Sequence, residues 1–142
     1  MNPNMTHIAL HVEQLDACVG FYRQYCQLRV IHERHKRGKR VIWMAEQGRE
    51  HQFVMVLLGE GGRHQQGKQD FSHLGFAVDS KAEVDRIAAE ADKEGLLVWP
   101  PIQEPYPVGY YCGLIDPNGN YVEFSYGQPL GPGSEDMPLL GH

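Results

Sequence analysis

The sequence is poor in cysteine, and its cysteines follow no spacing typical of a disulfide framework or a zinc–thiolate site. Cys18, Cys26 and Cys112 are the three cysteines among 142 residues, and no two of them form a Cys-x-x-Cys pair. An odd number at such distances excludes a complete set of internal disulfides. We interpret all three as buried or half-buried thiols, a common setting for cysteine in folded proteins.

Long apolar runs and an excess of positive charge are also absent. No apolar run approaches the roughly 18 residues that span a bilayer, and the opening stretch Met1–Met5 lacks the basic and apolar regions of a signal peptide. The formal net charge is −5, which argues against a nucleic-acid backbone as the main partner. We therefore expect a cytoplasmic, single-domain protein whose partner is neither a nucleic acid nor a membrane.

What is present is an internal repeat of a strand, a helix and three strands. In the first half, hydrophobic periodicity predicts a strand over Thr6–Val12, a helix from Asp16, a hairpin of Leu28–Glu33 with Arg40–Ala45, and a strand over Gln52–Leu58. The second half predicts a strand over Ser72–Val78, a helix from Ser80 to about Glu94, a short strand over Leu96–Trp99 followed by a stiff proline-rich loop, and a hairpin of Tyr110–Ile115 with Asn120–Tyr126.

The repeat predicts the domain organisation. We expect one domain over residues 1–127, with module one at 5–60, a linker at 61–70 and module two at 71–127, followed by a Gly- and Pro-rich tail at 128–142. The segment His7–Glu13 aligns with His73–Asp79, and Phe53–Gly59 aligns with Tyr121–Gly127. This alignment makes Met55 the counterpart of Glu123.

One carboxylate stands out in the last strand. Glu123 lies between Val122 and Phe124, where burying an ionised carboxylate is costly without a cationic partner. His7 and His73 start equivalent strands, and their neighbours on the same face of those strands are small, whereas the opposite face carries bulky residues. We expect the three side chains to converge at a concave surface. The same face is predicted to carry His11, Phe53, Met55, Leu57, Tyr121 and Ser125.

Two imidazoles and one carboxylate form a typical site for one divalent metal ion: Fe, Mn, Zn, Ni or Co. Three protein ligands leave coordination positions open, which is characteristic of catalytic rather than structural metals. A hydrogen-bonded core residue is the alternative interpretation for either histidine alone. The repeat favours the metal, because it places two histidines equivalently beside an otherwise unpaired carboxylate.

These motifs resemble those of the vicinal oxygen chelate superfamily, which includes glyoxalase I, type I extradiol dioxygenases, fosfomycin-resistance enzymes and bleomycin-binding proteins. The resemblance covers residues 5–127 and rests on the repeat, on Thr6–Ala9 and Ser72–Gly75, on Gly20–Tyr22, and on the Asp-Pro-Asn-Gly turn before Glu123. It implies an α+β fold of two βαβββ modules in tandem, with curved mixed sheets around a central metal cavity. It also implies a homodimer, and a small-molecule substrate that chelates the metal through two oxygens.

The resemblance places His7, His73 and Glu123 on metal-ligand positions and Met55 on the fourth. Glyoxalase I has a carboxylate there that moves the substrate proton, and a thioether cannot act as that base. Glu50, Glu60 or His51 would substitute only after a register shift that turns Val54 and Val56 into the cavity. Ala9 departs from the fosfomycin pattern, and Gly113 replaces a tyrosine of the ring-cleaving enzymes.

We therefore predict a metalloenzyme of oxygenase or lyase type, with His11, Tyr111 and Tyr121 as candidate catalytic groups. The alternative is a non-catalytic protein that binds or sequesters a drug or metabolite. A metal with a purely structural role is a third interpretation. A glyoxalase I-type isomerase and a fosfomycin-type transferase fit the residues less well.

Overall fold

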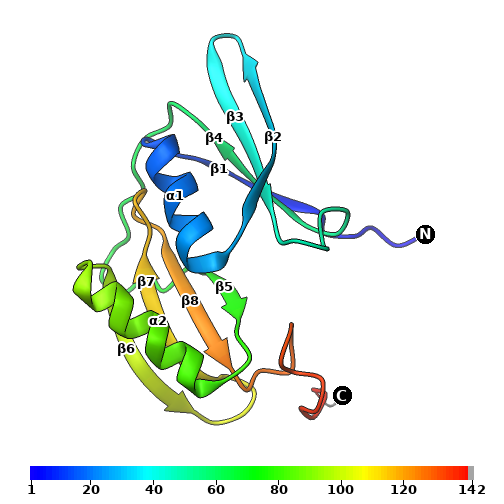
Figure 1. The fold of residues 1–142 in the computed structure, drawn as a ribbon, viewed down its shortest axis with the longest axis vertical. Helices are drawn as coiled ribbons and strands as arrows, with labels where there is room; N and C mark the ends of the chain where they lie inside the picture. Colours follow the sequence, from blue (N-terminus) through cyan, green and yellow to red (C-terminus); the bar gives the residue numbers. More distant parts are fainter. Residues whose placement is uncertain (141–142) are drawn as a thin grey trace. The chain divides into compact units, whose positions relative to one another are not determined.

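The computed structural model describes residues 1–140, and these fold into two compact units. The first unit comprises Met1–Gln65, and the second begins at Gln66, within the stretch 61–70 that we predicted to be a linker. Each unit contains one strand, one helix and three further strands, in that order (Figure 1).

The first unit is an open sheet of mixed direction with one helix. Its elements are β1 (His7–His11), α1 (Leu15–Cys26), β2 (Arg29–Lys36), β3 (Lys39–Ala45) and β4 (Val54–Leu58). The strand order is β1-β4-β3-β2, with β1 parallel to β4 and the other neighbours antiparallel.

The second unit repeats this topology. It consists of β5 (His73–Ala77), α2 (Lys81–Lys93), β6 (Leu97–Glu104), β7 (Gly109–Ile115) and β8 (Tyr121–Tyr126), in the order β5-β8-β7-β6. Again the first strand is parallel to the last, and the others pair antiparallel. The predicted α+β fold of tandem βαβββ modules is therefore confirmed.

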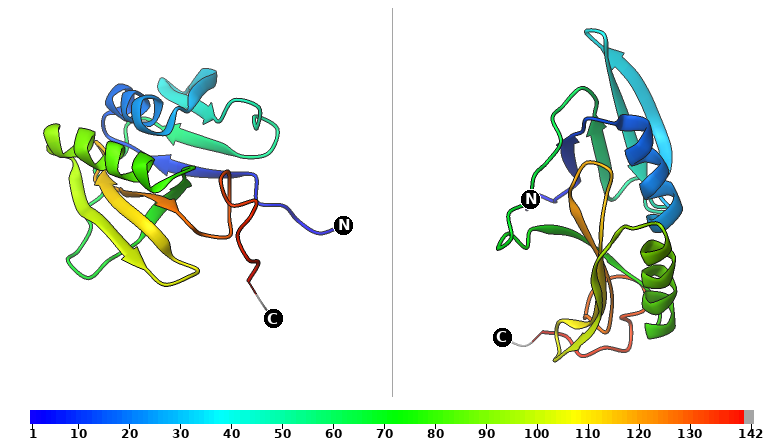
Figure 2. Two further views of the ribbon diagram at one scale, coloured as in Figure 1. Left: turned by 60° about the horizontal axis from the view of Figure 1, so that its bottom comes forward. Right: turned by 90° about the vertical axis from the view of Figure 1, so that its left-hand side faces the viewer.

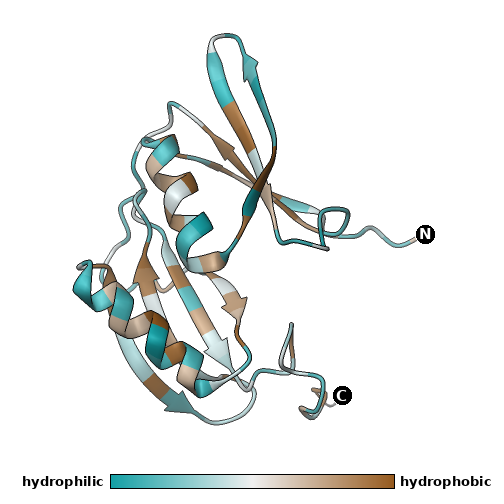
Figure 3. Cartoon of the chain, viewed as in Figure 1, coloured by the Kyte–Doolittle hydropathy of each residue, from teal (hydrophilic) through white to brown (hydrophobic). Residues whose placement is uncertain are grey.

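Helix α2 shows how the sequence sets the core of its unit. The Ser80 side chain accepts a hydrogen bond from the Glu83 backbone N–H at 3.1 Å, which caps the helix as predicted. The apolar stripe of α2 is buried and packs on β6, β7 and β8, so the helix covers one face of its sheet (Figure 2). Hydrophobic and hydrophilic residues accordingly alternate along the helix (Figure 3). The other sheet face remains available for a site.

Strand β6 corrects one prediction. It spans Leu97–Glu104 and runs through Pro100 and Pro101, where we expected a short strand followed by a stiff loop. Pairing with β7 is irregular on both sides of Trp99. Prolines are tolerated here because β6 is an edge strand, whose outward N–H groups have no strand to bond.

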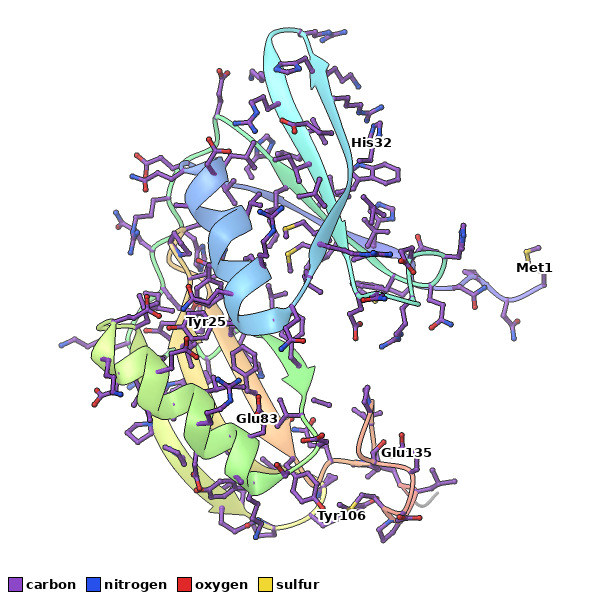
Figure 4. All side chains as sticks on the ribbon, in the orientation of Figure 1. Met1, Tyr25, His32, Glu83, Tyr106 and Glu135 are labelled. Atoms are coloured by element: carbon purple, nitrogen blue, oxygen red, sulfur yellow. The ribbon has the colours of Figure 1, made fainter. Side chains whose placement is uncertain are left out.

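The segment after β8 folds back on its own unit. Tyr106, labelled in Figure 4, donates a hydrogen bond from its hydroxyl to the carbonyl of Pro138. Gly133 lies against the backbone of Val78 and Asp79. Within residues 1–140, neither helix has the length and hydrophobicity needed to cross a membrane.

Candidate metal centre

A rigid turn sets the start of β8. The buried Asp116 carboxylate accepts hydrogen bonds from the backbone N–H groups of Asn118 and Asn120, at 2.8 and 2.9 Å. Gly119 has a φ of +86°, a conformation that glycine adopts without the strain of a Cβ atom. The Asp-Pro-Asn-Gly turn thus fixes the residue at which β8 begins, and with it the face of the sheet on which each β8 side chain lies.

The pairing of β5 with β8 brings two predicted ligands to one face. His73 is the register partner of Tyr121, and Gly75 is the partner of Glu123. Because side chains alternate along a strand, all four residues lie on the same side of the sheet. The opposite side carries the bulky residues, as predicted, and the Phe76 and Phe124 rings stack there at 5.8 Å.

His73 and Glu123 are in direct contact. Nε2 of His73 lies 2.6 Å from Oε2 of Glu123. Glu123 is only 8% exposed, whereas the His73 side chain is 36% exposed. The other carboxylate oxygen of Glu123 accepts a hydrogen bond from the Gln128 amide at 3.3 Å. The carboxylate is therefore buried, oriented, and presented to one histidine nitrogen.

The second ring nitrogen of His73 determines what this contact means chemically. Nδ1 lies 2.6 Å from the backbone carbonyl oxygen of Phe71, which can only accept a hydrogen bond. Nδ1 must therefore carry the proton, and in a neutral ring Nε2 is then a bare lone pair. That lone pair faces a carboxylate oxygen, so the contact needs a proton or a cation between two acceptors. A divalent metal fits this donor set, and a backbone carbonyl on Nδ1 is a common way to orient a ligating histidine.

The pair lies at a cavity of about 530 Å³ within the second unit. Most of its lining is aromatic or apolar, and consists of Phe71, Trp99, Ile102, Val108 and Tyr111. The three remaining lining residues are His73, Glu123 and Gln128. This volume is in the range of small-molecule sites, which combine apolar walls with a few convergent polar groups.

The candidate tyrosines differ in their surroundings. Tyr111 lines the cavity, and desolvation raises its pKa, as do the nearby charges of Glu104 and Glu123. Its phenol is therefore held protonated as a hydrogen-bond donor. Tyr121 shares the face of His73, and its ring packs at 5.3 Å from that of Trp99. Tyr110 points to the helix side instead, where its hydroxyl donates to Asp85 at 2.5 Å.

Trp99 is a cavity residue that the sequence analysis missed. Its ring contacts those of His73, Tyr121, Phe71 and Tyr111, with centroids 5.3–6.5 Å apart. We expected Trp99 to end a short strand, and the irregular pairing of a proline-containing edge strand was not readable from periodicity. The absence of a side chain at Gly113 was the available signal, because the indole occupies that space.

His7 lies in the first unit, at the start of β1, as His73 starts β5. It lines a cavity of about 360 Å³ in that unit, together with Arg34, Glu50 and His51. Oγ1 of Thr6 lies 2.9 Å from Nδ1 of His7. His11 is exposed on the same face, with its Cβ close to Gly61, and it does not line this cavity. Its catalytic role stays a prediction.

The register of β4 corrects the repeat alignment. His7 pairs with Val54 and Ala9 pairs with Val56, so these two valines share the cavity face. Both line the cavity, whereas Met55 and Leu57 are buried on the opposite face. The predicted placement of Met55 and Leu57 is therefore wrong by one residue. The larger side chains fill the core on the helix side, and the valines occupy the cavity.

The counterpart of Glu123 is consequently Val56 and not Met55, because each pairs with the third residue of its parallel partner strand. Valine can neither bind a metal nor move a proton, but this is the register in which we expected Glu50 or His51 to substitute, and both of these residues line the first-unit cavity. Glu50 does line the first-unit cavity, but it pairs with Arg29, whose hydrogen bond lowers the pKa of the Glu50 carboxyl. Among residues 1–140, no three His, Cys, Asp or Glu side chains are gathered closely enough to form a complete metal site.

Comparison with known proteins gives a family match and similar solved structures. The family model of the Glyoxalase/Bleomycin resistance protein/Dioxygenase superfamily matches residues 4–124. The uncharacterised protein PA2024 of Pseudomonas aeruginosa is 56% identical over 139 residues, which cover 98% of this chain and 99% of that protein.

Solved structures show the same fold at low identity. A possible glyoxalase from Bacillus cereus superposes with a TM-score of 0.65 at 24% identity, covering 86% of this chain and 97% of that one. A mutant of the fosfomycin resistance protein FosX from Listeria monocytogenes, complexed with Mn(II) and 1S,2S-dihydroxypropylphosphonic acid, has a TM-score of 0.69 at 17% identity. That match covers 88% of this chain and 93% of the FosX chain.

Proposed function

The chain belongs to the Glyoxalase/Bleomycin resistance protein/Dioxygenase superfamily, and from that premise we propose that it is a divalent-metal-dependent enzyme acting on a small molecule. The substrate would present two vicinal oxygens to the metal. His7, His73 and Glu123 would be the protein ligands, and the ion would be Fe, Mn, Zn, Ni or Co.

The observation that carries this proposal is the contact between His73 and Glu123. Nε2 of His73 and Oε2 of Glu123 face each other at 2.6 Å, and a backbone carbonyl accepts from the other ring nitrogen, so a proton or a cation must lie between them. A metal ion would supply that cation, and it would also give the buried carboxylate the cationic partner that its burial requires. His7 supports the same assignment, because it starts the equivalent strand of the repeat.

When bound, such a metal acts as a Lewis acid that stabilises negative charge on substrate oxygens. The chain's own residues would contribute three further functions. Gln128 holds the Glu123 carboxylate in its orientation, Tyr111 offers a protonated phenol as donor, and the aromatic wall around Trp99 gives the substrate an apolar surface. We place the reaction in the oxygenase or lyase class, because Val56 occupies the position where an isomerase would need a base, and because the nearby Glu50 carboxylate is held by Arg29.

The FosX structure shows a fold of this kind with Mn(II) and a molecule that bears two adjacent hydroxyl groups. This similarity supports the proposal that this chain binds a metal more strongly than it supports a phosphonate as the substrate. A phosphonate needs cationic partners, but of the described residues none that lines the second-unit cavity is Lys or Arg, and Arg34 is the only one that lines the cavity of His7. We also propose that the protein is a homodimer and is located in the cytoplasm.

A cobalt titration tests this function directly. Co(II) added to metal-free protein, purified without an affinity tag, should produce visible absorption bands that saturate at one ion per chain. Glu123→Gln should lose these bands. A bidentate oxygen ligand such as acetohydroxamate should then change the spectrum of the wild-type complex, because three protein ligands leave positions open.

Two outcomes would contradict the proposal. Failure of Co(II), Fe(II), Mn(II), Ni(II) and Zn(II) alike to bind would favour the non-catalytic binding protein. A bound metal whose spectrum is insensitive to acetohydroxamate would indicate a closed, structural site instead.

A further inference from the structure

One cross-strand row in the second unit has an unusual composition. Trp99 on β6 pairs with Gly113 on β7, Gly113 pairs with Glu123 on β8, and Glu123 pairs with Gly75 on β5. Figure 1 shows these four strands side by side. The predicted metal ligand is therefore flanked on both sides by residues without side chains.

The two glycines leave different kinds of space. A Cβ atom added to Gly113 would lie 2.2 Å from Cε3 of Trp99 and 2.6 Å from its Cδ2, so the indole occupies that position. A Cβ atom added to Gly75 would meet no atom of its unit within 4 Å. Next to Glu123, one side is thus covered by an indole and the other side is open.

The indole is held in place by its neighbours. It meets the rings of His73 and Tyr121 edge-on, at 5.6 and 5.3 Å, with interplanar angles of 89° and 75°. A ring that is fixed before a ligand arrives loses little conformational entropy on binding, so the indole is a preorganised surface for a flat partner. Trp99 is only half-buried, so it remains accessible from the cavity.

The rest of the wall is apolar and partly in water. Phe71 is 63% exposed, and Ile102 and Val108 are about 40% exposed, although all three line the cavity. Exposed apolar side chains around one pocket mark a place where a ligand is desolvated. Among the described residues that line this wall, Glu123 is the only Asp, Glu, Lys or Arg, and we assign its carboxylate to the metal.

We propose that Trp99 and Gly113 determine specificity, and that they select a substrate with a flat, uncharged aromatic ring next to its metal-binding oxygens. The ring would lie against the indole, and the row from Trp99 to Gly75 would set its distance from the metal. This inference rests on the proposed function, because it takes Glu123 as a ligand of the metal that the oxygens chelate.

Three hydroxamates that share one chelating group test this proposal. Benzohydroxamate carries a flat ring, cyclohexanecarbohydroxamate carries a ring of similar size that is not flat, and acetohydroxamate carries only a methyl group. Calorimetric titration of Co(II)-loaded protein should give tighter binding of benzohydroxamate than of either other compound. Trp99→Ala should lower benzohydroxamate affinity by roughly tenfold, the upper range for an aromatic pair, and leave acetohydroxamate binding unchanged.

Further variants separate a lost ring from a damaged fold. Trp99→Phe keeps a flat ring and should retain part of the preference. Gly113→Ala keeps the indole but displaces it, and should also lose the preference. Ile31→Ala removes an exposed apolar side chain of the first unit that lines neither of the two cavities, and should behave like wild type.

Equal effects of Trp99→Ala on all three hydroxamates would overturn the inference, as would a wild type with no preference for the flat ring. Loss of dimer in Trp99→Ala without loss of preference would assign the apolar wall to a subunit contact. A Trp99-dependent preference that persists in metal-free protein would support the aromatic subsite while contradicting the proposed metalloenzyme, so the two failures are distinguishable.

Discussion

The amide of Gln128 donates a hydrogen bond to Oε1 of Glu123 at 3.3 Å, from a position beyond residues 4–124 that the superfamily model matches. Gln128 also lines the second-unit cavity. This contact fixes one carboxylate oxygen and leaves the other directed at His73. The start of the tail thus belongs to the candidate site.

Gln128→Ala should weaken metal affinity without unfolding the protein. Loss of a partner that orients a ligand typically lowers metal affinity on the order of tenfold or more. Competition with a chelator of known affinity measures this change. Gln103→Ala is a matched control, because Gln103 is exposed and its side chain bonds only the neighbouring Glu104 carbonyl. Equal affinities for the two variants would show that Gln128 does not orient the ligand.

Glu123→Gln should separate stability from metal binding. The glutamine amide can donate to Nε2 of a neutral His73, so this contact no longer needs a proton or a cation in metal-free protein. We expect an unfolding temperature equal to or above that of the metal-free wild type, together with loss of metal binding. A large drop in unfolding temperature without metal would mean that the carboxylate has a structural role we have not identified.

Cys112 should be unreactive in the folded protein. Burial raises the pKa of its thiol to about 12, with smaller contributions from Asp85 and Glu123. The thiolate is the reactive form, so alkylation by iodoacetamide at pH 8 should leave Cys112 unmodified until the protein is denatured. Mass spectrometry of peptides measures this, with the less buried Cys26 as an internal comparison. Rapid labelling of Cys112 in native protein would contradict the packing of β7 against α2.

The same shift gives a direction for pH dependence. The unfolded chain releases the Cys112 proton near the ordinary thiol value of 9.0, whereas the folded chain holds it to about pH 12. Stability should therefore fall as the pH rises through this window. Cys112→Ser should show a shallower decline between pH 9 and 12 in urea unfolding experiments. An identical slope for the variant would contradict the raised pKa.

Removal of the cap on α2 should cost stability by a known mechanism. Ser80→Ala loses the hydrogen bond from the Glu83 N–H and should lower the free energy of unfolding by about 1 kcal/mol. Ser80→Asp keeps an acceptor at the same place and should retain most of the stability. Urea denaturation checks both, and equal losses for the two variants would argue against capping as the cause.

Much of the fold was predictable because its signals are local. The alternation around His73, the capping pair Ser80 and Glu83, and the Asp-Pro-Asn-Gly turn each depend on neighbouring residues, and each places an element within a few residues of where it lies. The face shared by His73 and Glu123 followed from strand alternation once the repeat was seen. These predictions needed no knowledge of distant contacts.

The misses have a different physical origin. The register of β4 depends on which side chains fill the core, and a one-residue difference exchanged Met55 for Val56 on the cavity face. The extent of β6 depends on its place at a sheet edge, which made Pro100 and Pro101 tolerable and brought Trp99 over Gly113. Both depend on tertiary neighbours, which periodicity alone does not specify.

The central claim is that His7, His73 and Glu123 bind one divalent metal ion. Metal content measured by inductively coupled plasma mass spectrometry, on protein purified without an affinity tag, tests this claim most directly. After incubation with each candidate metal and removal of excess, wild type should hold one ion per chain. His7→Ala, His73→Ala and Glu123→Gln should each hold none above background, and His64→Ala, an exposed histidine between β4 and β5, should match wild type. Full metal content in His73→Ala, or none in wild type with any of the metals, would contradict the account.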